Sequence, residues 1–358
     1  MKAILEKGTA EGASDIHLKA GLAPMHVKNG KVASLGIGEA LSNEEVRDLL
    51  FSVLSPKQIH EFDESQELDT SFDLPNIARF RLNMYHANAT TGAVIRVIPP
   101  SIRSVEELGL PPAVKRLAFE RQGLILVTGP TGSGKTTSLA ALIDYINSNK
   151  AGHIVTVEDP IEVVHPHKNC LITQREIGTD TPSFSIALRA ALRQAPNIIL
   201  VGEMRDQETI SMALKAAETG HLVFSTLHTN DAVQTINRVI NAFPPHEQEP
   251  IRIQLANSIK GCIAQRLVPR ADRAGRIAAI ELLVVTGTAR DAILKNEIEQ
   301  IYELIRGGAY DGMQSMNMSL LGFFKNGVID YETSIGYSEN AAEMTQMLRN
   351  ALRDPVKT

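Results

Sequence analysis

The chain has 358 residues, of which 43% are hydrophobic and 22% are charged, a balance that indicates an ordinary folded protein and excludes a disordered or fibrous one. A formal net charge of −5 argues against wholesale binding to nucleic-acid phosphates. The length suits two domains, and two distant cysteines, Cys170 and Cys262, exclude a disulfide framework and a zinc ribbon.

The apolar segments give the expected location. Residues Met1 to Ala13 carry scattered charges without an apolar run, which argues against a signal peptide. The longest apolar stretch, Ile277 to Val285, is interrupted by Glu281 and is far shorter than the roughly 20 residues that span a bilayer. We therefore expect a cytoplasmic protein whose membrane contact is peripheral or made through a partner.

Residues 1–98 mix short alternating segments with one helical stretch. Ala78 to Tyr85 and Ala93 to Ile98 alternate as strands do, and Ser42 to Leu54 has the spacing of a helix. Ser42 and Glu45 form a capping box at the start of that helix. The pattern predicts a small α+β domain over residues 1–98.

A proline-rich segment follows, and the pattern of apolar residues changes after it. Prolines at 99, 100, 111 and 112 predict a linker over residues 99–112. Beyond it, apolar strand-like runs alternate with helical ones, which predicts a parallel sheet covered on both faces in a domain over residues 113–275. The runs are Leu124 to Thr128, a helix opening at Gly134, Ile154 to Val157, Phe184 to Arg193, Ile198 to Val201, Thr209 to Glu218, and Leu222 to Ser225. After about residue 230 the pattern is mainly helical, and residues 276–358 are predicted to form a helical C-terminal region.

A phosphate-binding loop is the strongest motif. The segment fits GxxxxGK[ST] between an apolar strand and a helix, and Thr137 continues it into that helix. Its residues are Gly129, Pro130, Thr131, Gly132, Ser133, Gly134, Lys135 and Thr136. Backbone N–H groups would surround the phosphates of a nucleotide, Lys135 would lie between the β- and γ-phosphates, and Thr136 would hold Mg²⁺.

Carboxylates follow two further apolar strands. Glu203 comes after Ile198 to Val201, with Gly202 where an aspartate is usual, and could hold the Mg²⁺ shell or orient the attacking water. Glu158, Asp159 and Glu162 cluster after the run that ends at Val157. Such a cluster needs a neutralising cation, as at a Mg²⁺–nucleotide site or an arginine-rich surface, or else it is a solvated turn.

Two histidines flank the strand-like run Leu222 to Ser225. His221 and His228 lie seven positions apart with no cysteine partner, so zinc is a poor interpretation. A polar group at the tip of a strand beside the phosphate loop could instead respond to the γ-phosphate.

Taken in chain order, the four segments at residues 129–136, 156–162, 198–203 and 219–230 resemble the signature of the secretion and pilus ATPase superfamily. Residues 12–18, Gly-Ala-Ser-Asp-Ile-His-Leu, and the run Arg79-Phe80-Arg81 are similar to the N-terminal domain of its PilT family. The resemblance implies an α/β fold with a RecA-like P-loop catalytic domain, a smaller α+β, PAS-like N-terminal domain and a helical C-terminal region. It also implies a homo-hexameric ring that uses ATP and Mg²⁺ to pull pilins from a type IV pilus through an inner-membrane platform protein.

The same resemblance assigns roles to single residues. Glu162 matches the general base, Glu203 the Walker B glutamate, and His221 and His228 the histidine pair. Arg81 and Arg96 match arginines that reach the γ-phosphate, where a positive charge stabilises the transition state. Thr136, Glu203 and Glu158 are the candidate metal ligands, and the residues leave open whether Glu162 or Glu203 is the base.

Absences and departures shape the expected task. Assembly motors of the superfamily usually carry longer N-terminal extensions and a four-cysteine zinc site. Neither is found in this sequence, which favours retraction over assembly. The segment Thr288 to Lys295 retains only Arg290 and Ile293 of a stretch typical of PilT proteins, and Ala195-Pro196-Asn197 replaces a common acidic triplet. These changes leave open a main or an accessory retraction motor. The alternatives are a pilus assembly or secretion ATPase, a nucleic-acid translocase, which the acidic balance disfavours, and a non-hydrolysing switch.

Overall fold

The computed structural model describes residues 1–28, 30–75, 77–98 and 101–353. They form two compact units, which we call the N-terminal unit (Met1–Ile102 with Pro160–Val164) and the catalytic unit (Arg103–Asp159 with His165–Thr358). Pro99 and Pro100 of the predicted linker and the end of the predicted region 276–358 lie outside the described residues. The domain boundaries at 98, 112 and 275 stay a prediction.

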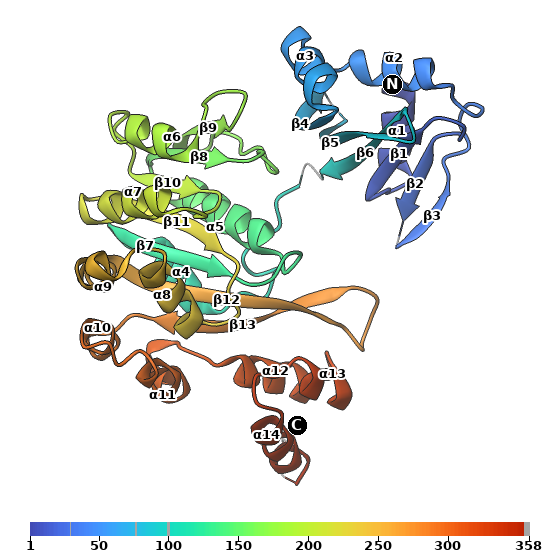
Figure 1. The fold of residues 1–358 in the computed structure, drawn as a ribbon. Coiled ribbons are helices and arrows are strands. Elements are labelled where there is room, and N and C mark those ends of the chain that lie inside the picture. The colour runs from blue at the N-terminus through green and yellow to red at the C-terminus, as the bar shows by residue number, and fades with distance from the viewer. Residues whose placement is uncertain (29, 76, 99–100, 354–358) are drawn as a thin grey trace. The chain divides into compact units, whose positions relative to one another are not determined.

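The N-terminal unit contains an antiparallel sheet with the strand order β3-β2-β1-β6-β5-β4 (Figure 1). Its strands are β1 (Asp15–Lys19), β2 (Met25–Lys28), β3 (Lys31–Ser34), β4 (Glu67–Leu74), β5 (Ala78–Ala87) and β6 (Thr90–Ile98), and its helices are α1 (Lys2–Ala10), α2 (Asn43–Phe51) and α3 (Pro56–Ser65). The predicted alternation in β5 is confirmed, because Phe80, Leu82 and Met84 are fully buried. The capping box of α2 is also confirmed, with Ser42 and Glu45 bonded reciprocally.

The catalytic unit is built on a sheet with the order β13-β12-β7-β11-β10-β8-β9 (Figure 1). Its strands are β7 (Gly123–Thr128), β8 (Gly152–Glu158), β9 (Cys170–Glu176), β10 (Ile198–Val201), β11 (Leu222–Leu227), β12 (Ile259–Pro269) and β13 (Arg276–Val284). All neighbours pair in parallel except β12 and β13. The predicted parallel sheet and the α/β fold are therefore confirmed.

Helices cover both faces of this sheet. The helices of the unit are α4 (Pro112–Ala118), α5 (Lys135–Asn149), α6 (Phe184–Ala191), α7 (Gln207–Glu218), α8 (Ala232–Asn241), α9 (Pro245–Ser258), α10 (Gly287–Leu294), α11 (Gln300–Gly307), α12 (Met316–Lys325), α13 (Tyr331–Gly336) and α14 (Ala341–Arg353), with a 3₁₀ turn η1 (Gly308–Asp311). Leu124 and Leu126 of β7 belong to a hydrophobic cluster with α7, α8 and α9, whereas Ile125 and Val127 belong to one with α4 and α5. Burial on both faces explains why the central strands have continuous apolar sequences.

The prediction of a mainly helical chain after residue 230 is wrong for the hairpin β12–β13. The hairpin extends the sheet beyond β7, since β12 pairs in parallel with β7 and antiparallel with β13. Periodicity alone does not distinguish a short apolar run in a buried strand from one in a buried helix.

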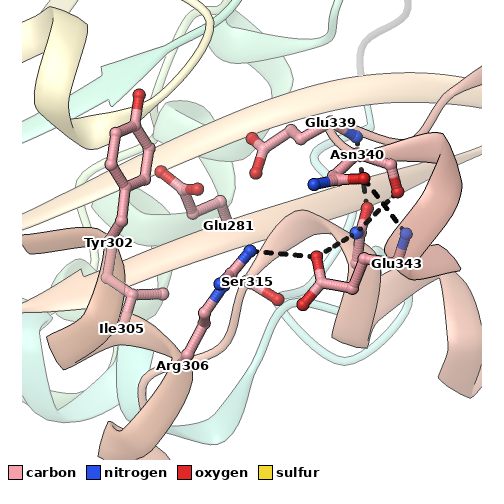
Figure 2. A pocket seen from close by; sticks show the side chains of 9 residues that line it. Glu281, Tyr302, Ile305, Arg306, Ser315, Glu339, Asn340 and Glu343 are labelled. Atoms are coloured by element: carbon pink, nitrogen blue, oxygen red, sulfur yellow. Dashed lines mark hydrogen bonds and ion pairs between the residues drawn. The ribbon is translucent and has the colours of Figure 1, made fainter. Parts of the chain in front are cut away.

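A small acidic pocket lies between β13 and the C-terminal helices. It has a volume of about 30 Å³, and Figure 2 shows Arg306 bonded to the Glu343 carboxylate in its lining. Asn317 Nδ2 donates to the same carboxylate at 2.7 Å. Glu281 of β13 is almost fully buried there, and one of its oxygens accepts a hydrogen bond from the backbone N–H of Ala232 at 2.8 Å. Burial, together with the charge of nearby Glu339, raises the pKa of the Glu281 carboxyl well above its ordinary value.

Two further expectations can be compared with the described residues. None of their helices combines the length and apolar character that crossing a bilayer requires. Cys170 and Cys262 are both buried free thiols.

Candidate active site

The loop between β7 and α5 has a backbone that requires glycine. Gly129 has a φ of +142°, and a Cβ on it would lie 2.3 Å from the backbone oxygen of Gln265. Gly132 has a φ of +76° with nothing within 4 Å of an added Cβ, so its backbone is open to a close approach. The loop ends at Lys135, the first residue of α5.

The same loop fits the phosphate groups of a nucleotide. The Ser133 hydroxyl is buried and has no hydrogen-bond partner among the described residues. The N-terminus of α5 has no side-chain cap, so the N–H groups of its first turn are available to an anion. Thr136 and Thr137 lie exposed in that turn. The phosphate chain of a nucleotide would accept hydrogen bonds from the uncapped helix start and the unpaired hydroxyl, and the open glycine turn leaves room for it.

Three strand ends bring a lysine, a histidine and a carboxylate together. Lys135 Nζ donates to the Gly129 carbonyl at 2.8 Å and lies 3.5 Å from His228 Nδ1, just beyond β11. His228 Nε2 lies 3.3 Å from Glu203 Oε1, just beyond β10. Arg205 Nε donates to the other Glu203 oxygen at 2.9 Å. The contacts fit an imidazole that accepts from Lys135 and donates to Glu203.

Parallel pairing explains this grouping. Leu227 of β11 pairs with Thr128 of β7, and Val201 of β10 pairs with Ser225 of β11, so the carboxyl ends of all three strands lie at the same edge of the sheet. Ligands of parallel α/β sheets bind at the carboxyl ends of the strands. The arrangement can therefore bind a nucleotide phosphate and present a carboxylate and an imidazole beside it.

Glu158 also ends a strand at this edge, but its carboxylate is engaged within the unit. Its Oε1 accepts hydrogen bonds from Thr156 Oγ1 at 2.6 Å and from Gln174 Nε2 at 3.1 Å, and the side chain is buried. Its predicted role as a metal ligand stays a prediction.

Glu162, Arg81 and Arg96 belong to the N-terminal unit. Arg81 and Arg96 are direct cross-strand neighbours in β5 and β6, and each is paired with acids. Arg81 donates to both oxygens of Asp69, at 3.1 and 2.7 Å, and lies 3.6 Å from Glu162. Arg96 donates to Asp15 at 2.9 Å. The structure thus pairs the predicted base with one of the two predicted arginines.

His221 is not brought to the phosphate loop. His221 precedes β11, whereas His228 follows that strand, so the two histidines lie at opposite ends of β11. The ring Nδ1 of His221 lies 3.0 Å from the Ala216 carbonyl at the end of α7. Its predicted role stays a prediction that this position does not support.

Sequence reasoning missed Gln265 of β12. Its side chain is 1% exposed, and its Nε2 donates to the Ser133 carbonyl of the phosphate loop at 2.7 Å. No local pattern marks this residue, because its place depends on β12 pairing beside β7.

Comparisons with known proteins agree with this geometry. Residues 1–290 match the family model of the type II/IV secretion system proteins. The chain is 46% identical to the type IV pilus retraction ATPase PilT of Pseudomonas aeruginosa, over 92% of this chain and 96% of that protein. It is 39% identical to the type IV pilus ATPase PilU of the same organism, over 95% of this chain and 88% of that one.

A solved structure gives the same assignment. The crystal structure of the pilus retraction motor PilT with bound ADP superposes with a TM-score of 0.89 at 44% identity, covering 96% of this chain and 99% of that one. The fold, the phosphate loop and the relatives therefore agree, and the chain belongs to the type II/IV secretion system protein family and, within it, to the PilT-like ATPases.

Proposed function

We propose that this chain is the ATP-hydrolysing motor that powers retraction of a type IV pilus. The observation that carries the proposal is the contact series from Lys135 through His228 to Glu203 at the phosphate loop. The similarity to PilT, named as a pilus retraction ATPase and aligned over nearly the whole of both chains, supports the same task.

The catalytic unit would bind the nucleotide in the following way. The N–H groups of the loop and the Lys135 ammonium hold the phosphates, and the His228 ring changes its hydrogen bonds when the γ-phosphate leaves. Thr136 and Glu203 would hold Mg²⁺, because a hydroxyl and a carboxylate are ligands that this ion prefers. When bound, Mg²⁺ neutralises charge on the β- and γ-phosphates.

Hydrolysis also needs a base and a positive charge for the transition state. Glu203 or Glu162 orients and deprotonates the attacking water. Arg81 and Arg96 stabilise the charge that develops on the phosphoryl group. The pairing of Arg81 with Glu162 supports a shared task, since each would influence where the other side chain is held.

The assembly and its location are part of the proposal. Six copies would form a ring at the cytoplasmic face of the inner membrane and act on a membrane platform protein of the pilus. Sedimentation of the purified protein with Mg²⁺ and ATP should give a hexamer. A monomer under all nucleotide conditions would contradict the ring.

ATP turnover and a retraction assay test the function together. Wild-type protein should release phosphate from ATP, and Lys135→Ala should abolish nucleotide binding and turnover. Lys150→Ala, at the other end of α5, is the matched control and should retain both. In an organism that carries this gene, deleting it should stop twitching while pili remain on the surface. Loss of the pili themselves would favour an assembly motor.

A further inference from the structure

Gln265 lies where the phosphate loop begins. Ala264 pairs with Thr128, the last residue of β7, so Gln265 follows the last ladder position beside the loop. Its side chain is almost fully buried, and Nε2 donates to the Ser133 carbonyl at 2.7 Å. The nearest strand therefore reaches into the loop with a polar side chain.

This bond orients a peptide group of the loop. A trans peptide is planar, so its carbonyl and its N–H point in opposite directions. When Gln265 holds the Ser133 carbonyl, it also fixes the direction of the Gly134 N–H in the same peptide. Gly134 is the N-cap of α5 with a φ of +89°, a position that supplies an N–H to an anion at the helix start.

Gln265 contacts both ends of the loop. Its backbone oxygen lies 2.3 Å from where a Cβ on Gly129 would stand, and its Nε2 lies 3.2 Å from where one on Gly134 would stand. Residue 265 thus lies against both ends of the loop, and the contact at Gly134 is the one that depends on its side chain.

Stability alone does not explain a glutamine here. The Gln265 Oε1 is buried and has no hydrogen-bond partner among the residues that the structure describes. An unpaired buried amide oxygen is unfavourable. An apolar side chain of similar size would avoid it and would lose only the bond to the Ser133 carbonyl, so the two effects on stability oppose each other. A residue kept at such a cost to the core points to a task in the site.

We infer that Gln265 is a positioning residue of the nucleotide site, which sets the peptide between Ser133 and Gly134 so that its N–H faces the phosphates. The inference rests on the proposed ATP-binding function and adds a residue to it. Gln265 acts through the loop backbone, and the loop makes the contact with the nucleotide.

The test compares Gln265→Leu with Gln314→Leu. Gln314 is a matched control, because its Nε2 also donates to a backbone carbonyl, that of Ile280, at 2.9 Å in the same unit. Binding of a fluorescent ADP analogue and the Tm without nucleotide are measured for both variants. Gln265→Leu should bind at least tenfold more weakly with a Tm close to that of the wild type, whereas Gln314→Leu should bind as the wild type does.

Wild-type affinity in Gln265→Leu, or an equal loss in both variants, would overturn the inference. If Gln265→Leu does not fold, the unbranched Gln265→Met decides by the same binding measurement. A wild-type protein that binds no ADP would contradict the proposed function instead, so the two failures are distinguishable.

Discussion

The His228 ring lies 3.3 Å from the Glu203 carboxylate, and this contact joins the ends of two adjacent parallel strands beside the phosphate loop. Glu203→Gln keeps the size of the side chain and removes its charge. We expect turnover to fall about a hundredfold or more, because a carboxylate that orients water contributes about that much. ADP should still bind, since Lys135 and the loop are unchanged.

Phosphate release and ADP binding measure this prediction. Glu208→Gln is the control, because Glu208 is an exposed acid of α7 that pairs with Arg189. Equal turnover in the Glu203 and Glu208 variants would exclude a catalytic role for Glu203.

Arg81→Ala tests the N-terminal unit. If Arg81 acts on the phosphoryl group, turnover should fall about a thousandfold or more while the catalytic unit still binds ADP. Arg47→Ala is the matched control, because the Arg47 and Arg81 side chains are both 31% exposed and both pair with an aspartate in that unit. A wild-type rate in Arg81→Ala would refute the assignment.

Two glycines of the loop should differ in their tolerance of alanine. In Gly132→Ala the new Cβ meets open space, so only the left-handed backbone is penalised, by about 1 kcal/mol. In Gly129→Ala the Cβ would meet the Gln265 backbone, which must move. We expect Gly129→Ala to lose more stability and all ADP binding, as denaturant midpoints and ADP titration would show. Equal losses in the two variants would contradict the described loop.

Glu281 should make stability depend on pH. Burial raises the pKa of its carboxyl well above the ordinary value of 4.5, so between these two values the folded state binds more protons than the unfolded state. The free energy of unfolding should therefore fall as the pH rises above about 4.5, by at most about 1.4 kcal/mol per pH unit for this proton. Glu281→Gln, which mimics the protonated acid, should flatten this dependence and be more stable than wild type at pH 8.

Denaturant midpoints between pH 5 and pH 8 measure this effect. Glu332→Gln, on an exposed position of α13, should keep the wild-type pH dependence. If Glu281→Gln keeps it as well, the buried carboxyl is not its source.

Local patterns predicted the elements that hold the phosphate loop. Ile198–Val201 is a strand with the predicted bounds. A four-residue apolar run after a proline-containing turn is too short for a helix and is typical of a buried strand. The helix predicted to open at Gly134 begins at Lys135 with Gly134 as its N-cap. Glycine spacing and apolar runs are short-range signals, so they can be recognised in the sequence without knowledge of the fold.

Pairings between distant segments could not be read in this way. Gln265 approaches Ser133 across 132 positions of the chain, and Glu281 approaches Ala232 across 49. Both contacts depend on the hairpin β12–β13, whose pattern does not distinguish a strand from a helix. His221 and His228 show the opposite case, in which residues close in sequence lie far apart in space. Seven positions along an extended strand separate them by about 20 Å.

The short segment Pro160–Val164 has a practical consequence for dissecting this protein. It belongs with residues before 102, although it is encoded after them. A fragment ending at Ile102 would lose the Ile161 carbonyl to which Arg79 donates at 2.8 Å, and a fragment starting at Arg103 would carry the segment without its sheet. Neither half of a simple truncation would be a whole folding module, because the cut separates Pro160–Val164 from the sheet it belongs to.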